Sequence, residues 1–231
     1  MNFAKTDEQR ALHSGLEAFL ATGSVGWDDV ATGFGLEALG RSEDEGGLGT
    51  GAREAAVVAS LLGPFGLGDD WAGHWVAMRT GEGSNAGGAD WKDDALTLLH
   101  CAEIVGLCRA MLADAVAYSK ERHQFGKAIG SFQALRHRMV DMRLSLEQAA
   151  AMTDYAIDLI DGDAPARAKA VSAARVLAGD AARVVGGGAV QVHGAMGLTE
   201  ELRVGRLFRR AALLALGDGT ERTHLTRYAA A

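Results

Sequence analysis

The sequence has little proline and cysteine and no excess of positive charge. Its 231 residues include two prolines and two cysteines, and 23 Lys and Arg stand against 30 Asp and Glu, a net charge of −7. No basic field is present of the kind that binds phosphate backbones, so nucleic acid is not an expected partner. Cys101 and Cys108 lie seven residues apart on a predicted helix, about 10 Å along its axis. That is too far for a disulfide, and both are expected to be buried, apolar thiols.

Membrane and strand signals are also missing. The chain opens MNFAKTDEQR, without a basic and apolar leader, and no uninterrupted apolar run approaches the roughly 20 residues of a membrane span. We therefore expect no membrane partner, and a cytoplasmic location by default. No stretch alternates apolar and polar residues with period two, which favours an all-α fold. No metal site is predicted.

Apolar residues instead recur with a helical period along most of the chain. The clearest runs are Leu98, Cys101, Val105, Cys108, Leu112 and Ala115, and Leu135, Met139, Met142, Leu146, Ala149 and Met152. Helices are predicted over 92–120, 132–160, 166–185 and 199–216, with a last one from about Thr220. The third is expected to end at Gly186-Gly187-Gly188. The four long helices predict a bundle, capped by the last one.

The N-terminal part is predicted to be reduced. Shorter helices are expected at about 6–20 and 52–62, separated by the glycine-rich loop EDEGGLGTG. Residues 63–90 are rich in Gly and Asp and predict a linker with at most a turn of helix. The predicted organisation is therefore a helical region at 1–62, a linker at 63–90 and the bundle at 91–231.

Three short motifs stand at the ends of the predicted helices: RHQFGKAIGSFQ at 122–133, QVHGAMGLTEE at 191–201 and GDGT at 217–220. Their order and spacing resemble the three flavin-side motifs of the acyl-CoA dehydrogenase family. FAKTDEQRAL and EDEGGLGTG are similar to that family's opening helix and glycine-rich loop, so the likeness covers nearly the whole chain except 63–90. It implies an all-α, acyl-CoA dehydrogenase-type bundle, FAD as cofactor and an acyl-CoA substrate.

The first motif forms a corner between two predicted helices. By the resemblance, Arg122 offers a forked donor to the FAD pyrophosphate, and Phe125 a face for the flavin or its adenosine. Gln124 and Gln133 are assigned to the same cofactor, and the two glycines of the motif allow the backbone to turn and approach closely. Without the other motifs, a glycine-broken helix corner capped by Arg122 would be the favoured explanation of these residues, and with them the cofactor role is favoured.

The second motif matches the family's Gln-x-x-Gly-Gly stretch at Gln191 and Gly194. In the family this stretch receives part of the dinucleotide from the neighbouring subunit. Ala195 replaces the second glycine, which puts close backbone approach at this point in doubt. His193 is expected to be packed or to cap a helix, because the sequence fixes no carboxylate, Ser or Cys partner near it. In the third motif, Thr220 is assigned to the cofactor.

The catalytic base is the open question. In one family branch a Glu before Gly-Thr removes the α-proton of the thioester while hydride leaves the β-carbon for the flavin. Asp218 matches that position with a side chain shorter by one methylene, and three interpretations remain: a working base, a weak base, or a relic in a turn that favours Asp. Another branch places a Glu near Leu96, which cannot take a proton. Glu103 is expected to pack or hydrogen-bond, and Glu221 to open the last helix.

The family also has a β-barrel-like middle domain, for which residues 63–90 are too few. That domain covers the flavin and lines the acyl-CoA channel, so this chain alone would leave both exposed. The resemblance therefore implies a partner, either a full-length homologue in an α2β2 hetero-oligomer or a second copy in a homodimer. We expect that partner to supply the base. Two functions follow: a dehydrogenase subunit, acting on a bulky acyl-CoA such as a steroid side chain, or a non-catalytic helical scaffold that stabilises a catalytic homologue.

Overall fold

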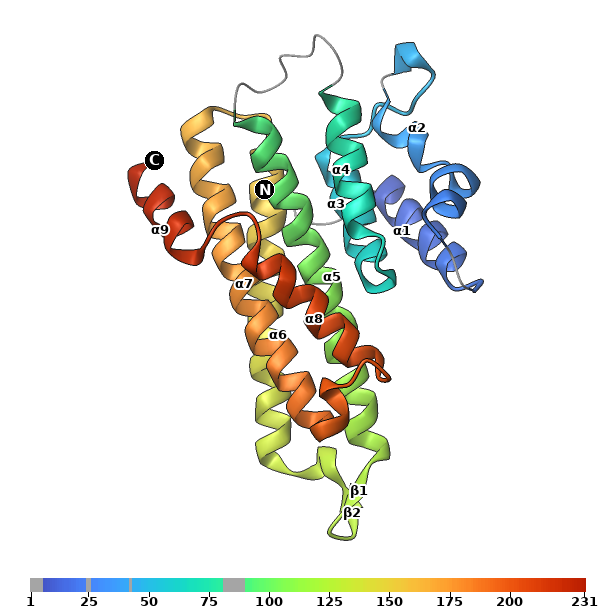
Figure 1. The fold of residues 1–231 in the computed structure, drawn as a ribbon, viewed down its shortest axis with the longest axis vertical. Helices are drawn as coiled ribbons and strands as arrows, with labels where there is room; N and C mark the ends of the chain where they lie inside the picture. The colour runs from blue at the N-terminus through green and yellow to red at the C-terminus, as the bar shows by residue number, and fades with distance from the viewer. Residues whose placement is uncertain (1–5, 24–25, 42, 81–89) are drawn as a thin grey trace.

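The computed structural model describes residues 6–23, 26–41, 43–80 and 90–231, and its elements are almost all helical (Figure 1). The helices are α1 Asp7–Leu20, α2 Leu36–Gly40, α3 Ala52–Leu62, α4 Gly68–Arg79, α5 Trp91–Glu121, α6 Gln133–Asp158, α7 Ala164–His193, α8 Arg203–Leu216 and α9 Glu221–Ala230. Two-residue strands, β1 His123–Gln124 and β2 Lys127–Ala128, form a hairpin. A short π-helix occupies 29–34, and short 3₁₀-helices occupy 43–45, 63–65, 129–131 and 194–198. The all-α prediction is confirmed.

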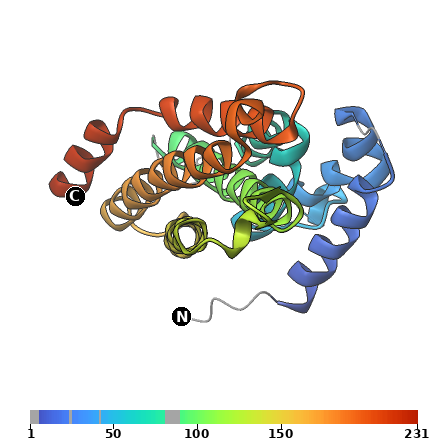
Figure 2. The same cartoon turned by 90° about the horizontal axis from the view of Figure 1, so that it is seen from below.

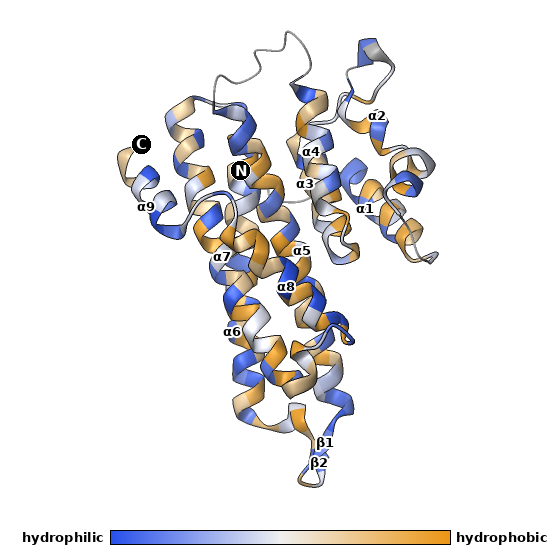
Figure 3. Cartoon of the chain, in the orientation of Figure 1, coloured by the Kyte–Doolittle hydropathy of each residue, from blue (hydrophilic) through white to orange (hydrophobic). Residues whose placement is uncertain are grey.

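The long helices α5, α6 and α7 run side by side, and α8 crosses α5 and α7 (Figure 1). Helices α1 and α9 lie on opposite sides of this bundle (Figure 2). Helix α5 is largely hydrophobic, whereas hydrophilic and hydrophobic residues alternate along α8 (Figure 3). Among the described residues, α5 alone is long and apolar enough to cross a membrane. Of its most apolar 18-residue window, 78% is buried inside the protein, as in the core helix of a bundle.

Helix α7 continues where the sequence predicted its end. It passes through the three glycines at 186–188 and stops at His193, so the predicted end is wrong. Close packing gives the reason. A Cβ at Gly186 would lie 2.5 Å from Cδ2 of Phe208, and one at Gly188 2.5 Å from Sδ of Met142. These glycines allow α6 and α8 to approach α7 closely, and the contact outweighs the low helix propensity of glycine.

The segment 63–90 is also more ordered than predicted. The expectation of at most a turn of helix is wrong, because α4 spans Gly68–Arg79. Trp71 and Trp75 are fully buried; Trp71 Nε1 donates to the carbonyl of Ala55 at 2.8 Å, and the ring of Trp75 lies 6.1 Å from that of Trp91. Two buried indoles thus override a glycine-rich composition. Residues 81–89 lie outside the described part of the chain, and the domain boundaries remain a prediction.

Candidate functional site

The corner between α5 and α6 is a hairpin with an exposed tip. Its two-residue loop, Phe125-Gly126, has positive φ at both positions, 52° and 79°, as a type I′ turn requires. The Phe125 side chain is 91% exposed. A Cβ at Gly130 would lie 2.9 Å from Oγ of Ser119, so glycine allows the corner to pack on α5. The corner therefore presents an aromatic ring to an external group.

The polar residues predicted from this corner are exposed as well. Arg122 is the C-cap of α5, and its carbonyl accepts a 2.8 Å hydrogen bond from the Ile129 amide. Gln124 lies in β1, and Gln133 opens α6 with its Nε2 3.5 Å from Nε2 of His137. Arg122, Gln124 and Gln133 are thus open to a ligand or a second chain.

The C-terminal end of α7 lies against the C-terminal end of α5, next to the corner. The ring of His193 stacks on Tyr118 with centroids 4.5 Å apart, and its Nδ1 donates to the carbonyl of Ala189 at 2.8 Å. The predicted packing role of His193 is confirmed. Gln191 and Gly194 are exposed, and Gly194 has a φ of 69°. The first two motifs therefore share one end of the bundle.

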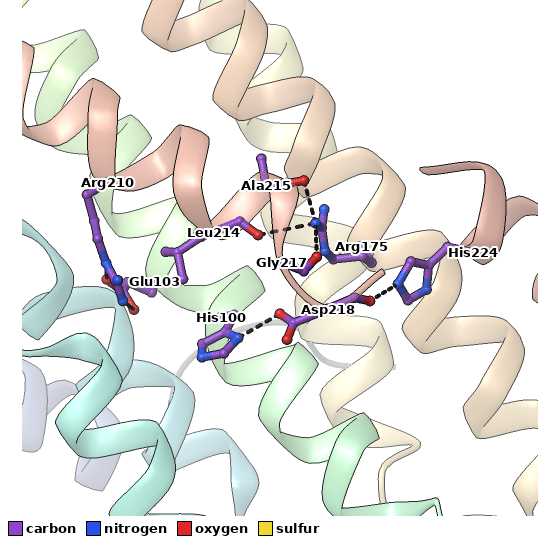
Figure 4. Close-up of polar contacts among 9 residues, drawn as sticks. All are labelled: His100, Glu103, Arg175, Arg210, Leu214, Ala215, Gly217, Asp218 and His224. Atoms are coloured by element: carbon purple, nitrogen blue, oxygen red, sulfur yellow. Dashed lines mark hydrogen bonds and ion pairs between the residues drawn. The ribbon is translucent and has the colours of Figure 1, made fainter. Parts of the chain in front are cut away.

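The third motif forms the turn between α8 and α9, and two side chains hold its backbone (Figure 4). Arg175 Nη2 donates to the carbonyls of Leu214, Ala215 and Gly217 at 3.2, 2.6 and 2.8 Å. His224 Nε2 donates to the carbonyl of Asp218 at 2.6 Å. These contacts cap the C-terminus of α8 and fix the backbone of the turn.

Thr220, the last residue of the motif, is the N-cap of α9. Its hydroxyl accepts from the Thr223 amide at 3.2 Å, and Glu221 lies in the first turn of α9, as predicted. Thr220 also borders a groove of about 430 Å³ between α7 and α8, which Phe208 and Leu216 help to line. Space for a ligand is therefore available beside this turn.

The Asp218 side chain reaches α5, where its Oδ2 lies 2.6 Å from Nδ1 of His100 (Figure 4). The two side chains are 15% and 14% exposed. The sequence analysis did not identify His100, and no local spacing could have done so, because 118 positions separate the pair. Burial raises the pKa of the neighbouring Cys101 thiol to about 12; nearby Arg175 lowers it and Asp218 adds to the rise. Both cysteines are buried and free, as predicted.

Glu103 lies one turn beyond His100 and faces Arg210 on α8. Arg210 Nε and Nη2 donate to its two carboxylate oxygens at 2.7 and 3.0 Å, and the Glu103 side chain is 1% exposed. The predicted packing and hydrogen-bonding role of Glu103 is confirmed. Leu96 packs partly buried against the core.

The fold does not gather the three motifs at one place. His100 marks the level of the turn on α5, and Arg122 marks the corner, about 33 Å further along the axis at 1.5 Å per residue. The corner and the end of α7 thus form one group, and the turn with Asp218 and Thr220 forms another. A site that needs both groups together requires a second chain.

Comparison with known proteins identifies a family whose model matches most of this chain. Residues 97–231 match the model for "Acyl-CoA dehydrogenase, C-terminal domain". A short-chain specific acyl-CoA dehydrogenase from Megasphaera elsdenii is 32% identical over 225 residues, covering 96% of this chain and 53% of that protein. Subunit CarC of the caffeyl-CoA reductase-Etf complex of Acetobacterium woodii is 30% identical over 119 residues, 52% of this chain and 31% of the subunit.

The structural comparison agrees. The solved structure of butyryl-CoA dehydrogenase from Megasphaera elsdenii matches with a TM-score of 0.56 and 32% identity, over 60% of this chain and 36% of that one. The chain spans about half the length of its full-length match among the curated relatives.

Proposed function

The chain belongs to the acyl-CoA dehydrogenase family, and we propose that it is one subunit of a FAD-dependent acyl-CoA dehydrogenase that works with a full-length homologue. The separation of the two motif groups along α5 carries this proposal. The corner residues lie at one end of the bundle and the turn residues some 33 Å away, so each group can complete a cofactor site only with residues of a partner.

The residues at both places suit parts of FAD. Arg122 and the two glutamines, Gln124 and Gln133, are exposed donors for a pyrophosphate, and the Phe125 ring offers a flat apolar face. Gln191 and Gly194 extend the same end, and Thr220 borders a groove. When bound, FAD would accept hydride from the β-carbon of the acyl thioester. This chain's residues bind and orient the cofactor, and the partner encloses it.

The connection between α4 and α5 supports the need for a partner. Helix α4 ends at Arg79 and α5 begins at Trp91, so too few residues intervene for the family's middle domain. The chain also offers an apolar surface. Val140 and Leu144 on α6 are 56% and 58% exposed, and Leu144 lines a groove of about 300 Å³ between α6 and α7. Such a surface suits a second helical bundle. The name of CarC, a subunit of a complex, fits a role of this kind for a relative.

The substrate we propose is an acyl-CoA with a bulky acyl group, such as a steroid side chain. A subunit that lacks the domain lining the acyl channel leaves room for a wide group. This part of the proposal rests on analogy with the family.

The test is to purify the chain alone and together with a full-length acyl-CoA dehydrogenase homologue from the same genome. We expect the pair to carry flavin absorbance and to oxidise an acyl-CoA, and the single chain to do neither. A pair without thioester oxidation would refute the proposal. The scaffold function predicts instead an active pair in which Arg122→Ala and Asp218→Asn change neither flavin content nor turnover.

A further inference from the structure

We propose that His100 is a positioning residue that orients the Asp218 carboxylate for removal of the α-proton of the acyl-CoA. The inference rests on the proposed function and assigns the base to this chain, contrary to the expectation from sequence. His100 Nδ1 lies 2.6 Å from Asp218 Oδ2. An ionised carboxylate can only accept, so Nδ1 carries the proton and donates it.

The backbone of Asp218 is fixed from the other side. It has a φ of 52°, in the left-handed region that few side chains adopt and Asp tolerates. Arg175 holds the carbonyl of Gly217, and His224 holds that of Asp218. With the main chain held, the remaining freedom is in the side-chain torsions, which the His100 contact restricts. Both oxygens of the carboxylate therefore have defined directions.

Glu103, one turn away on α5, shows what a purely structural carboxylate looks like here. Both of its oxygens receive donors from the permanently charged Arg210, and its side chain is 1% exposed. Asp218 is 15% exposed, and its Oδ1 accepts no hydrogen bond from the described residues. The Asp218 carboxylate thus keeps one oxygen available for a proton, whereas Glu103 does not.

The step requires no oxidant. The α-carbon C–H bond breaks, the proton goes to Oδ1 of Asp218, and the electron pair stays on the substrate as the thioester enolate. In D₂O the carboxyl proton exchanges and a deuteron returns to the α-carbon. Because Asp is shorter than Glu, its orientation has little tolerance; a misplacement of about 1 Å costs on the order of 100-fold in rate. The hydrogen bond from His100 to Oδ2 holds the Asp218 carboxylate in the required orientation.

The experiment measures deuterium incorporation at the α-carbon by mass spectrometry in D₂O. The assembly of both subunits is used with its flavin chemically reduced, so that no oxidation occurs, and with butyryl-, octanoyl- and a steroid-side-chain acyl-CoA as probes. We expect His100→Leu to slow the exchange about 100-fold, with flavin content and KM for oxidation unchanged. His100→Asn places an amide nitrogen where Nδ1 stands and should restore most of the rate. His100→Gln places it where Nε2 stands and should not. His13→Leu, the same change on α1, is the matched control and should leave the rate unchanged.

Three results would overturn the inference. Full exchange in His100→Leu, with exchange lost in Asp218→Asn, would show that Asp218 works without His100. Full exchange in Asp218→Asn would place the base in the partner and leave the dehydrogenase function standing. An unmodified assembly that neither exchanges nor oxidises any of the three thioesters would refute the proposed function together with the inference.

Discussion

Replacing Glu103 by Gln should destabilise the protein strongly without directly removing a catalytic group. The Glu103 side chain is 1% exposed, and its two oxygens accept from Nε and Nη2 of Arg210, which joins α5 to α8. Gly63 and Gly68 pack closely against the Glu103 side chain, since a Cβ at Gly63 would lie 2.5 Å from Cγ of Glu103. The site is therefore closed by three segments and has little room to rearrange.

The magnitude follows from the burial of the pair. Breaking a buried ion pair by removing one charge costs about 3–5 kcal/mol, because the other charge is left uncompensated. Two features moderate this cost. Arg210 is 24% exposed and so keeps some hydration, and Gln retains one acceptor oxygen. We therefore expect a loss of about 3 kcal/mol in the free energy of unfolding. At roughly 2–4 °C per kcal/mol for a chain of this size, Tm falls by about 6–12 °C.

Urea unfolding followed by circular dichroism measures this loss. The matched control is Glu147→Gln on α6, which breaks an exposed pair with Arg143 whose side chains are 66% and 51% accessible. That change should cost less than about 0.5 kcal/mol. A cost for Glu103→Gln as small as the control's would show that the reasoning from burial is wrong. Lost turnover at unchanged stability would instead make Glu103 a catalytic group.

Further predictions test other parts of the structure. Arg122→Ala should weaken flavin retention by the assembly by roughly 1.5–3 kcal/mol, the range for hydrogen bonds to charged groups, as measured by flavin release; unchanged affinity would assign the cofactor sites wholly to the partner. Burial raises the pKa of Cys101 and of Cys108 from 9.0 to about 12, so a thiol reagent at pH 8 should label neither until the chain unfolds. Above pH 9 the two thiols ionise in the unfolded chain but stay protonated in the folded one, because folding raises their pKa values. The free energy of unfolding, measured in urea, should therefore be unaffected by these thiols below pH 9 and should fall from pH 9 toward 12. A Cβ added at Gly187 would have no neighbouring atom within 4 Å, so Gly187→Ala should stabilise α7 by about 0.5–1 kcal/mol. Gly188→Ala, on the face packed against Met142, should destabilise the protein in the same urea assay.

Periodicity predicted the bundle well because the apolar residues of its long helices recur at helical spacing. Helices α5 and α6 agree with the predicted ranges to within two residues. The misses have a common physical cause. The end of α7 and the existence of α4 depend on contacts between distant segments, such as Gly188 against Met142 and Trp71 against Ala55. Local composition gives the cost of a glycine but not the packing that offsets it.

The candidate site divides in the same way. Arg122, Gln191 and Thr220 belong to contiguous motifs, so a sequence could identify them as candidates, and their cofactor roles stay predictions. The contact of His100 with Asp218 joins residues 118 positions apart and depends on where α8 ends against α5. No motif contains that information.

The arrangement along α5 links these observations to a dependence on other chains. A single long helix carries His100 in its first third and leads into Arg122 at its C-terminal end, so its own rigidity keeps the two motif groups about 33 Å apart. No side-chain rotation can close that distance, and a bend of α5 would break the buried core around Ile104 and Met111. If the proposed function holds, the turn of this chain meets the corner of another chain, and its corner meets another chain's turn. Under that proposal a change to either group affects a site shared with the partner, so flavin content and proton exchange have to be measured on the assembly.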